Sequence, residues 1–242
     1  MRRFLILLIF FCSPLLAQKP NIYFLSIPKS GTFHFAEVLK KLSGKPNSTW
    51  GFHGPEMGVT HVQFEHFVPK AHQLLRKVHE DPNAICFFLI RELKDGICSA
   101  YHMAETRFGI VMMEKFYPQE HYFSCSTEEK VNIIMDHSRQ IYHARRAEEL
   151  IRLYKDDKKY FVVRYEDLIQ PIHKNKAFLM QLTRRLKSQL NWQQVQGVMR
   201  SIGVNENFRK GVIGDHKNLF TKGNYEHFEK FRPLNEALGY QD

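Results

Sequence analysis

Two short apolar runs constrain the fold of this chain more than any other feature of its sequence. Residues 22–27 read IYFLSI and residues 85–90 read ICFFLI. The second run has no polar side chain, which is typical of a strand that is buried on both faces of a parallel sheet. A polar cluster follows each run, and apolar residues at helical spacing come next. We therefore expect two strand–loop–helix units.

The rest of the chain extends this pattern. Further elements are expected as a helix at 70–79, one long helix from the capping box at Ser126 towards Tyr154, a strand at 160–165, and one or two helices between 175 and 200. Asp95 is expected to cap the helix after the second run. Residues 47–66 are expected to be loop, and the chain from Gly203 onward is expected to be rich in loops and basic. This alternation predicts a three-layer α/β/α fold with a central parallel sheet, in a single domain over residues 21–242.

The first 17 residues differ from the rest. Arg2 and Arg3 precede an apolar run over residues 4–11, and Ala17 follows a Ser-Pro break. This pattern predicts a signal peptide that is cleaved after Ala17. The run is shorter than the roughly 17 to 25 residues of a membrane span. A short uncleaved membrane anchor is the alternative.

Composition narrows the choice of partners. The formal net charge of +10 favours anionic ligands, but no Lys/Arg tract marks a nucleic-acid tail, so no nucleic-acid partner is expected. No C-x-x-C motif occurs, and histidine pairs such as His61 and His66 lack the spacing of helical metal ligands. We therefore expect no metal. Reduced thiols are expected, with a Cys98–Cys125 or Cys86–Cys125 disulfide as the alternative in a secreted protein.

The first polar cluster suits an anion. Residues 28–32 read PKSGT, between a predicted strand and a predicted helix. Gly31 allows the backbone to curl, so that successive N–H groups and the helix dipole point at one spot. Lys29 adds a full positive charge, and Ser30 and Thr32 add hydroxyl donors. The cluster is not a Walker A loop, because its Lys precedes the Ser-Gly pair.

Two more clusters carry the same chemistry. Arg91 ends the second apolar run, and Ser99 lies eight residues further on, so the pair suits a second phosphate. Residues 208–221 read FRKGVIGDHKNLFT, a cationic and glycine-containing segment that suits closure over a nucleotide. Taken alone, each of these clusters is also compatible with an ordinary structural role.

Together the motifs resemble the sulfotransferases that use 3′-phosphoadenosine-5′-phosphosulfate (PAPS), particularly the cytosolic type. PKSGT resembles the 5′-phosphosulfate loop of that family, and RELKDGICS at 91–99 resembles its 3′-phosphate motif. YEDL at 165–168 is similar to a segment that follows a strand in the family. The last cluster is similar to its C-terminal signature. The resemblance covers residues 22–231.

The resemblance implies a P-loop-like fold, PAPS as co-substrate and PAP as product. The nucleotide site that it implies consists of Lys29, Ser30, Gly31, Thr32, Phe33, His34, Arg91, Ser99, Tyr165, Phe208, Arg209, Lys210 and Gly211. Lys29 is also expected to stabilise the leaving oxygen during in-line attack. The family's general base is a His between the first two clusters. His61 is the best match, and His53 and His66 are its rivals.

The chain departs from the family pattern at several positions. These are Phe33 for Thr, His34 for Trp, Val59 for Lys, His216 for Trp, and Lys222 for Val in the dimerisation motif at Lys217–Glu226. The changes bear on adenine affinity, rate and dimerisation more than on the fold.

The expected function is transfer of a sulfuryl group to a hydroxyl or amine on a small-molecule or carbohydrate acceptor. A catalytically silent module that binds PAP or PAPS is the alternative, and a P-loop kinase is less favoured. The leader predicts a secretory or Golgi-like lumen or a membrane-associated chain, with a cytoplasmic chain as the alternative. Membrane contact is expected only through the N-terminal segment, and a homodimer is expected through Lys217–Glu226.

Overall fold

A parallel sheet forms the centre of the fold. The computed structural model describes residues 19–45, 48–50, 59–63, 68–106, 119–137, 139–202 and 212–241. Within these ranges the strands are β1 (Asn21–Ser26), β2 (Ser48–Trp50), β3 (Val59–Gln63), β4 (Ala84–Ile90) and β5 (Tyr160–Arg164). All neighbouring pairs are parallel, and their order is β2-β3-β1-β4-β5. The leader expected at residues 1–17 lies outside the described residues.

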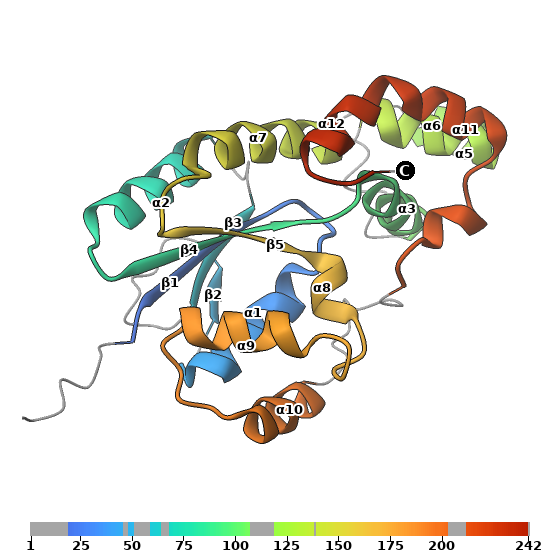
Figure 1. The fold of residues 1–242 in the computed structure, drawn as a ribbon. Coiled ribbons are helices and arrows are strands. Elements are labelled where there is room, and N and C mark those ends of the chain that lie inside the picture. The colour runs from blue at the N-terminus through green and yellow to red at the C-terminus, as the bar shows by residue number, and fades with distance from the viewer. Residues whose placement is uncertain are drawn as a thin grey trace, which may run out of the picture.

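Helices cover both faces of this sheet (Figure 1). On one face lie α2 (Val68–Glu80), α3 (Leu93–Ala104), α5 (Gln119–Ser124), α6 (Thr127–His137), α7 (Arg139–Tyr154), α11 (Lys222–Phe228) and α12 (Arg232–Ala237). On the other face lie α1 (Thr32–Ser43), α9 (Lys176–Arg185) and α10 (Trp192–Ser201). The short α8 (Tyr165–Ile169) follows β5 directly. The expected three-layer α/β/α fold is confirmed.

The two apolar runs predicted from the sequence separate the two cores of the molecule. All seven residues of β4 are buried, as expected for a strand covered on both faces. Cys86 and Phe88 belong to the core under α2, α3 and α7. Phe87 faces the other core, where its ring meets that of Phe35 from α1 edge-on, with 5.6 Å between centroids.

The expected loop at residues 47–66 is wrong, because it contains β2 and β3. Residues 59–63 pair in register with residues 22–26 of β1, so tertiary pairing makes a strand from a segment with a mixed polar sequence. The C-terminal region is also more helical than expected. Thr221 caps α11 by accepting the Asn224 amide hydrogen at 3.2 Å, and Asn224 Oδ1 accepts from the Thr221 amide at 3.0 Å. An Asn replaces the Glu or Gln that usually signals such a box.

The single long helix expected after Ser126 is two helices. The predicted capping box is present, since the Ser126 amide donates to Glu129 Oε2 at 2.8 Å. However, α6 ends at His137 and α7 begins at Arg139. Both helices contact α3, but α6 also packs against α11, whereas α7 packs against β4 and α12. Tertiary packing therefore divides one continuous apolar pattern.

Two further expectations concern cysteines and membranes. Cys86, Cys98 and Cys125 are free thiols, so neither alternative disulfide is present. Within the described ranges, no helix combines the length and the apolar character that crossing a bilayer requires.

Candidate functional site

The loop after β1 is built by contacts among its own residues. Ser30 Oγ donates to the Ile27 carbonyl at 2.5 Å, and the hydroxyls of Ser26 and Thr32 lie 2.8 Å apart. Gly31 is the N-cap of α1 and has a φ of 80°, in the left-handed region that favours glycine. Within the described chain no side chain caps this helix, so its positive end is formed by backbone.

Lys29 follows the strand in a left-handed conformation, with a φ of 63°. Such a conformation is uncommon for a residue with a side chain and is characteristic of functional loops. Its ammonium lies 3.5 Å from the Met103 sulfur, which directs the side chain towards α3. Lys29 therefore lies over the same end of the sheet as the loop after β4.

Arg91 joins the two predicted phosphate clusters. Its guanidinium donates through Nη1 to the Lys29 carbonyl at 3.0 Å and through Nη2 to the Val212 carbonyl at 3.3 Å. The side chain is buried, and its Nε has no hydrogen-bond partner among the described residues. The arginine thus lies between the loop after β1 and the start of the described C-terminal segment.

Tyr165, at the start of α8, packs between Arg91 and Gly31. The Arg91 guanidinium carbon lies 4.4 Å from the centre of the Tyr165 ring. A Cβ on Gly31 would lie only 2.5 Å from Tyr165 Cε2, so only glycine fits under the ring. Lys29, Gly31, Arg91 and Tyr165 are therefore brought together, as the sequence motifs predict.

Asp95 anchors the C-terminal segment to α3. Asp95 Oδ2 accepts the Gly214 amide hydrogen at 2.7 Å, and Oδ1 lies 2.8 Å from His216 Nδ1. The expected helix-capping role of Asp95 is wrong, because α3 begins at Leu93 and Asp95 lies inside its first turn. Burial alone would raise the pKa of Asp95, but the hydrogen bonds from His216 and Gly214 lower it below its ordinary value. His216 therefore occupies a buried, hydrogen-bonded position.

Glu166 supports the backbone next to Arg91. Its Oε1 accepts the Glu92 amide hydrogen at 3.2 Å, and the Tyr240 hydroxyl donates to its Oε2 at 2.7 Å. Burial raises the pKa of this carboxyl. The end of the chain thus contacts the base of the Arg91 loop.

His34 lines a cavity of about 260 Å³ next to α1. Its other walls come from α8, α9, α10 and the segment after α8, through Leu168, Ile169, Gln170, Ile172, Asn175, Leu179 and Met199. Burial lowers the pKa of His34, which favours the neutral ring. The cavity is mostly apolar.

The other residues predicted for the site lie in α3, α1 and β3 or outside the described residues. Ser99 is half-buried within α3, and Phe33 is 48% exposed on α1. His61 lies inside β3, paired with Phe24 and not in the expected loop. The catalytic rivals His53 and His66 lie outside the described residues. So do the predicted nucleotide contacts Phe208, Arg209, Lys210 and Gly211.

The sequence patterns did not identify several residues of this region. One sequence signal could have indicated the ion pair of Asp95, namely its position four residues after Arg91. In the structure its carboxylate lies 3.9 Å from the Arg91 guanidinium. Glu166 and Tyr240 are 74 residues apart in the sequence, so no local pattern could predict their hydrogen bond.

Two side-chain groups also contain potential metal ligands. They are Glu92, Asp95 and His216, and Cys98, His102 and Asp215. The four-residue spacing of Cys98 and His102 was the available signal for the second group.

The fold, but not the sequence, is similar to known proteins. No family model and no curated protein matches the sequence. The structure is similar to the crystal structure of mouse sulfotransferase SULT7A1 complexed with PAP, with a TM-score of 0.61 and 17% sequence identity. The similarity covers 92% of this chain and 88% of that chain. The chain therefore has the three-layer, P-loop-like α/β/α fold of this sulfotransferase.

Proposed function

We propose that this chain binds PAPS and transfers its sulfuryl group to a hydroxyl or amine of a small-molecule or carbohydrate acceptor. One observation carries the proposal: the Arg91 guanidinium contacts the Lys29 carbonyl, so two cationic residues meet where β1 and β4 end. Strands continue outward on both sides of this pair, and α/β sheets bind ligands at such a switch point. The likeness to a sulfotransferase complexed with PAP supports the same class of ligand.

The residues present fit a nucleotide that is phosphorylated at two positions. Lys29 and the backbone at Gly31 would hold the 5′ end, at the positive end of α1. Arg91 and Ser99 would hold the 3′-phosphate. The buried Nε of Arg91 supports this assignment, because a buried N–H without a partner in the described chain favours an anionic acceptor.

Lys29 would act on the reaction itself. Sulfuryl transfer resembles phosphoryl transfer, in which charge develops on the leaving oxygen. A lysine ammonium next to that oxygen lowers the barrier by stabilising this charge.

A histidine would take the proton of the acceptor. His61 is one candidate, but its partner Phe24 lies two residues before the end of β1. His66 follows the last residue of β3 by three positions in the sequence. We propose that His61, His66 or His53 is the base.

A thermal-shift experiment tests the nucleotide. We expect PAP to raise the melting temperature of the purified chain by about 5 to 10 °C at a hundredfold excess over its Kd. ADP and ATP, which lack the 3′-phosphate, should shift it much less. Lys29→Ala and Arg91→Ala should each abolish the PAP shift, measured against the melting temperature of the same variant without ligand.

Two variants serve as controls with the same loss of charge. Lys222 and Arg152 have side chains that are 92% and 74% exposed and form only surface ion pairs. Lys222→Ala and Arg152→Ala should keep the PAP shift. Equal shifts with PAP and ATP, or stabilisation by Mg-ATP alone, would contradict the proposal and favour a kinase.

A second experiment tests transfer separately from binding. PAP release from PAPS is measured with a panel of phenols, alcohols, amines and sugars, for the native chain and for His53→Ala, His61→Ala and His66→Ala. The variant of the base should lose at least about 100-fold in rate while keeping the PAP shift. PAP binding without turnover on any acceptor would instead support the silent module, which Val59 and His34 favour.

A further inference from the structure

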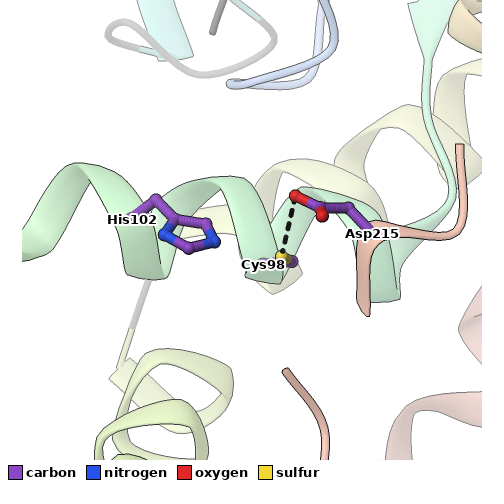
Figure 2. Close-up of side chains that lie close together, drawn as sticks. All are labelled: Cys98, His102 and Asp215. Carbon is purple, nitrogen blue, oxygen red and sulfur yellow. Dashed lines mark hydrogen bonds between the residues drawn. The ribbon is translucent and has the colours of Figure 1, made fainter. Parts of the chain in front are cut away.

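Three side chains of different chemistry converge between α3 and the C-terminal segment. Cys98 and His102 lie four residues apart on α3, and a helix places such residues on one face. Asp215, at the start of the short helix η2 (Asp215–Asn218), faces them from a segment more than 100 residues away. Figure 2 shows His102 one turn along the helix from Cys98, with Asp215 across from the sulfur.

The distances and burial of these groups suit a small cation. Cys98 Sγ lies 3.6 Å from Asp215 Oδ2, and the potential ligand atoms of all three residues lie within 4.8 Å of one another. Cys98 and Asp215 are buried, whereas His102 is half-buried. The half-buried imidazole leaves a side from which an ion can enter.

The donor set matches one metal best. Sulfur, imidazole nitrogen and carboxylate oxygen are the three ligand types that Zn²⁺ takes in proteins. Tetrahedral bonds of about 2.0 to 2.3 Å place neighbouring ligand atoms roughly 3.3 to 3.8 Å apart. The Cys98–Asp215 distance already lies in this range. A movement of about 1 Å by the half-buried His102 side chain would bring in the third ligand.

The neighbouring group of Glu92, Asp95 and His216 is a weaker candidate. Its ligand atoms are equally close, but Asp95 already accepts hydrogen bonds from the Gly214 and His216 amides and contacts the His216 ring. A metal there would have to compete with an anchoring network that the fold uses. The Cys98 group instead offers a sulfur donor, and a thiolate–zinc bond would replace the S–H···O contact between Cys98 and Asp215.

We propose that Cys98, His102 and Asp215 form a Zn²⁺ site with three protein ligands and one position for water. On binding, the Cys98 thiol loses its proton to solvent, a thiolate–zinc bond forms, and neutral His102 and ionised Asp215 complete the set. The ion joins α3 to η2 and so fastens the segment that follows the predicted nucleotide contacts at 208–211. The site does not depend on the proposed sulfuryl transfer.

Cobalt substitution tests the site on the full chain. After treatment with a chelator, the protein is titrated with Co²⁺ under reducing conditions, and then Zn²⁺ is added. We expect one equivalent of Co²⁺ to produce a thiolate-to-cobalt charge-transfer band in the near ultraviolet, and Zn²⁺ to abolish it. The readout does not involve PAP or turnover, so the failure of either proposal is visible separately.

Variants identify the ligands. Cys98→Ser should abolish the charge-transfer band, and His102→Asn and Asp215→Asn should weaken Zn²⁺ binding at least tenfold. His102→Asn is the safest of these for folding because that side chain is half-buried. Cys125 and His121 provide matched controls, since they form another Cys/His pair four residues apart, with Cys125 Sγ donating to the His121 carbonyl.

Cys125→Ser and His121→Asn should leave both measurements unchanged. The proposal is overturned if the native chain gives no charge-transfer band. It is also overturned if the band survives in Cys98→Ser, or if Zn²⁺ binding is the same in the folded His102→Asn protein as in the native chain.

Discussion

The loops after β1 and β4 lie side by side at the end of the sheet but are held in different ways. Hydrogen bonds between near neighbours shape the loop after β1, from Ser30 to the Ile27 carbonyl and between Ser26 and Thr32, and Arg91 also donates to this loop from outside. The loop after β4 is stabilised from distant parts of the chain. The Glu92 amide donates to Glu166 across 74 positions, and the Leu93 amide donates to Asn235 Oδ1 across 142 positions.

This difference indicates how each half of the candidate site forms. The hydrogen bonds within the first loop need only the strand and the helix beside it. A loop held by α8 and by the last helices needs the complete fold. We therefore expect the loss of a hydrogen bond within the first loop to act locally, and substitutions around Arg91 to loosen the C-terminal segment as well.

The largest effect is expected from Gly31→Ala. The new Cβ would clash with the Tyr165 ring, and the residue would keep a strained left-handed φ. The free energy of unfolding should fall by about 2 to 5 kcal/mol in urea titrations. Gly44→Ala is the control. Gly44 also has a positive φ, but its new Cβ would meet only the flexible end of Lys19, so the cost should be about 1 kcal/mol. Equal costs would show that Tyr165 does not restrict the loop.

The next largest effect is expected from Asp95→Asn. The change removes a buried negative charge that faces Arg91 and that accepts hydrogen bonds from the Gly214 and His216 amides. The free energy of unfolding should fall by about 3 kcal/mol. Protease cleavage between α10 and α11 should also become faster. Glu226→Gln, which loses only an exposed ion pair with Lys222, should cost about 0.5 kcal/mol or less. Unchanged protease sensitivity in Asp95→Asn would argue against its anchoring role.

The carboxyl groups of buried Asp95 and half-buried Glu166 should respond to pH in opposite directions. The pKa of Asp95 is lowered in the folded chain, so its stabilisation is present above its unfolded pKa near 3.8 and is lost as the pH falls below it. The pKa of Glu166 is raised above 4.5. The folded state therefore retains that proton longer, and stability falls as the pH rises from 4.5 to the raised value.

Melting temperatures between about pH 3 and pH 8 check these signs. Asp95→Asn should reduce the fall in melting temperature at acidic pH. Glu166→Gln should reduce the fall in melting temperature above pH 4.5. The same pH profile in Glu166→Gln as in the native chain would show that this carboxyl does not titrate as its burial implies.

The smallest effect is expected from Tyr240→Phe. This change removes one hydroxyl donor to Glu166, and the free energy of unfolding should fall by about 1 to 2 kcal/mol. Tyr142→Phe, on a side chain that is 48% exposed, should have almost no effect. If the two variants were equally stable, the end of the chain would contribute nothing to the Arg91 loop.

The same difference explains what the sequence could predict. The strands at β1 and β4, the turn at Gly31 and the meeting of Lys29 and Arg91 follow from local patterns and from the parallel sheet, whereas the place of Tyr165 was implied by the family resemblance. β3 could not be recognised, because its strand character comes from pairing with β1. The role of Asp95 was also missed, since its partners Gly214 and His216 lie about 120 residues away. Local rules therefore predict the first loop well and the support of the second poorly.

The hydrogen bonds of Arg91 imply that a nucleotide binding at this site would exchange one set of hydrogen bonds for another. Two of the nitrogens of its guanidinium already donate to main-chain carbonyls, one on each side. A phosphate that takes those donors has to replace them, so the measured affinity would report only the difference between the two sets of bonds. A ligand that binds this arginine would also break its hydrogen bond to the Val212 carbonyl. The rate of ligand exchange would then depend on how fast the backbone at Val212 moves.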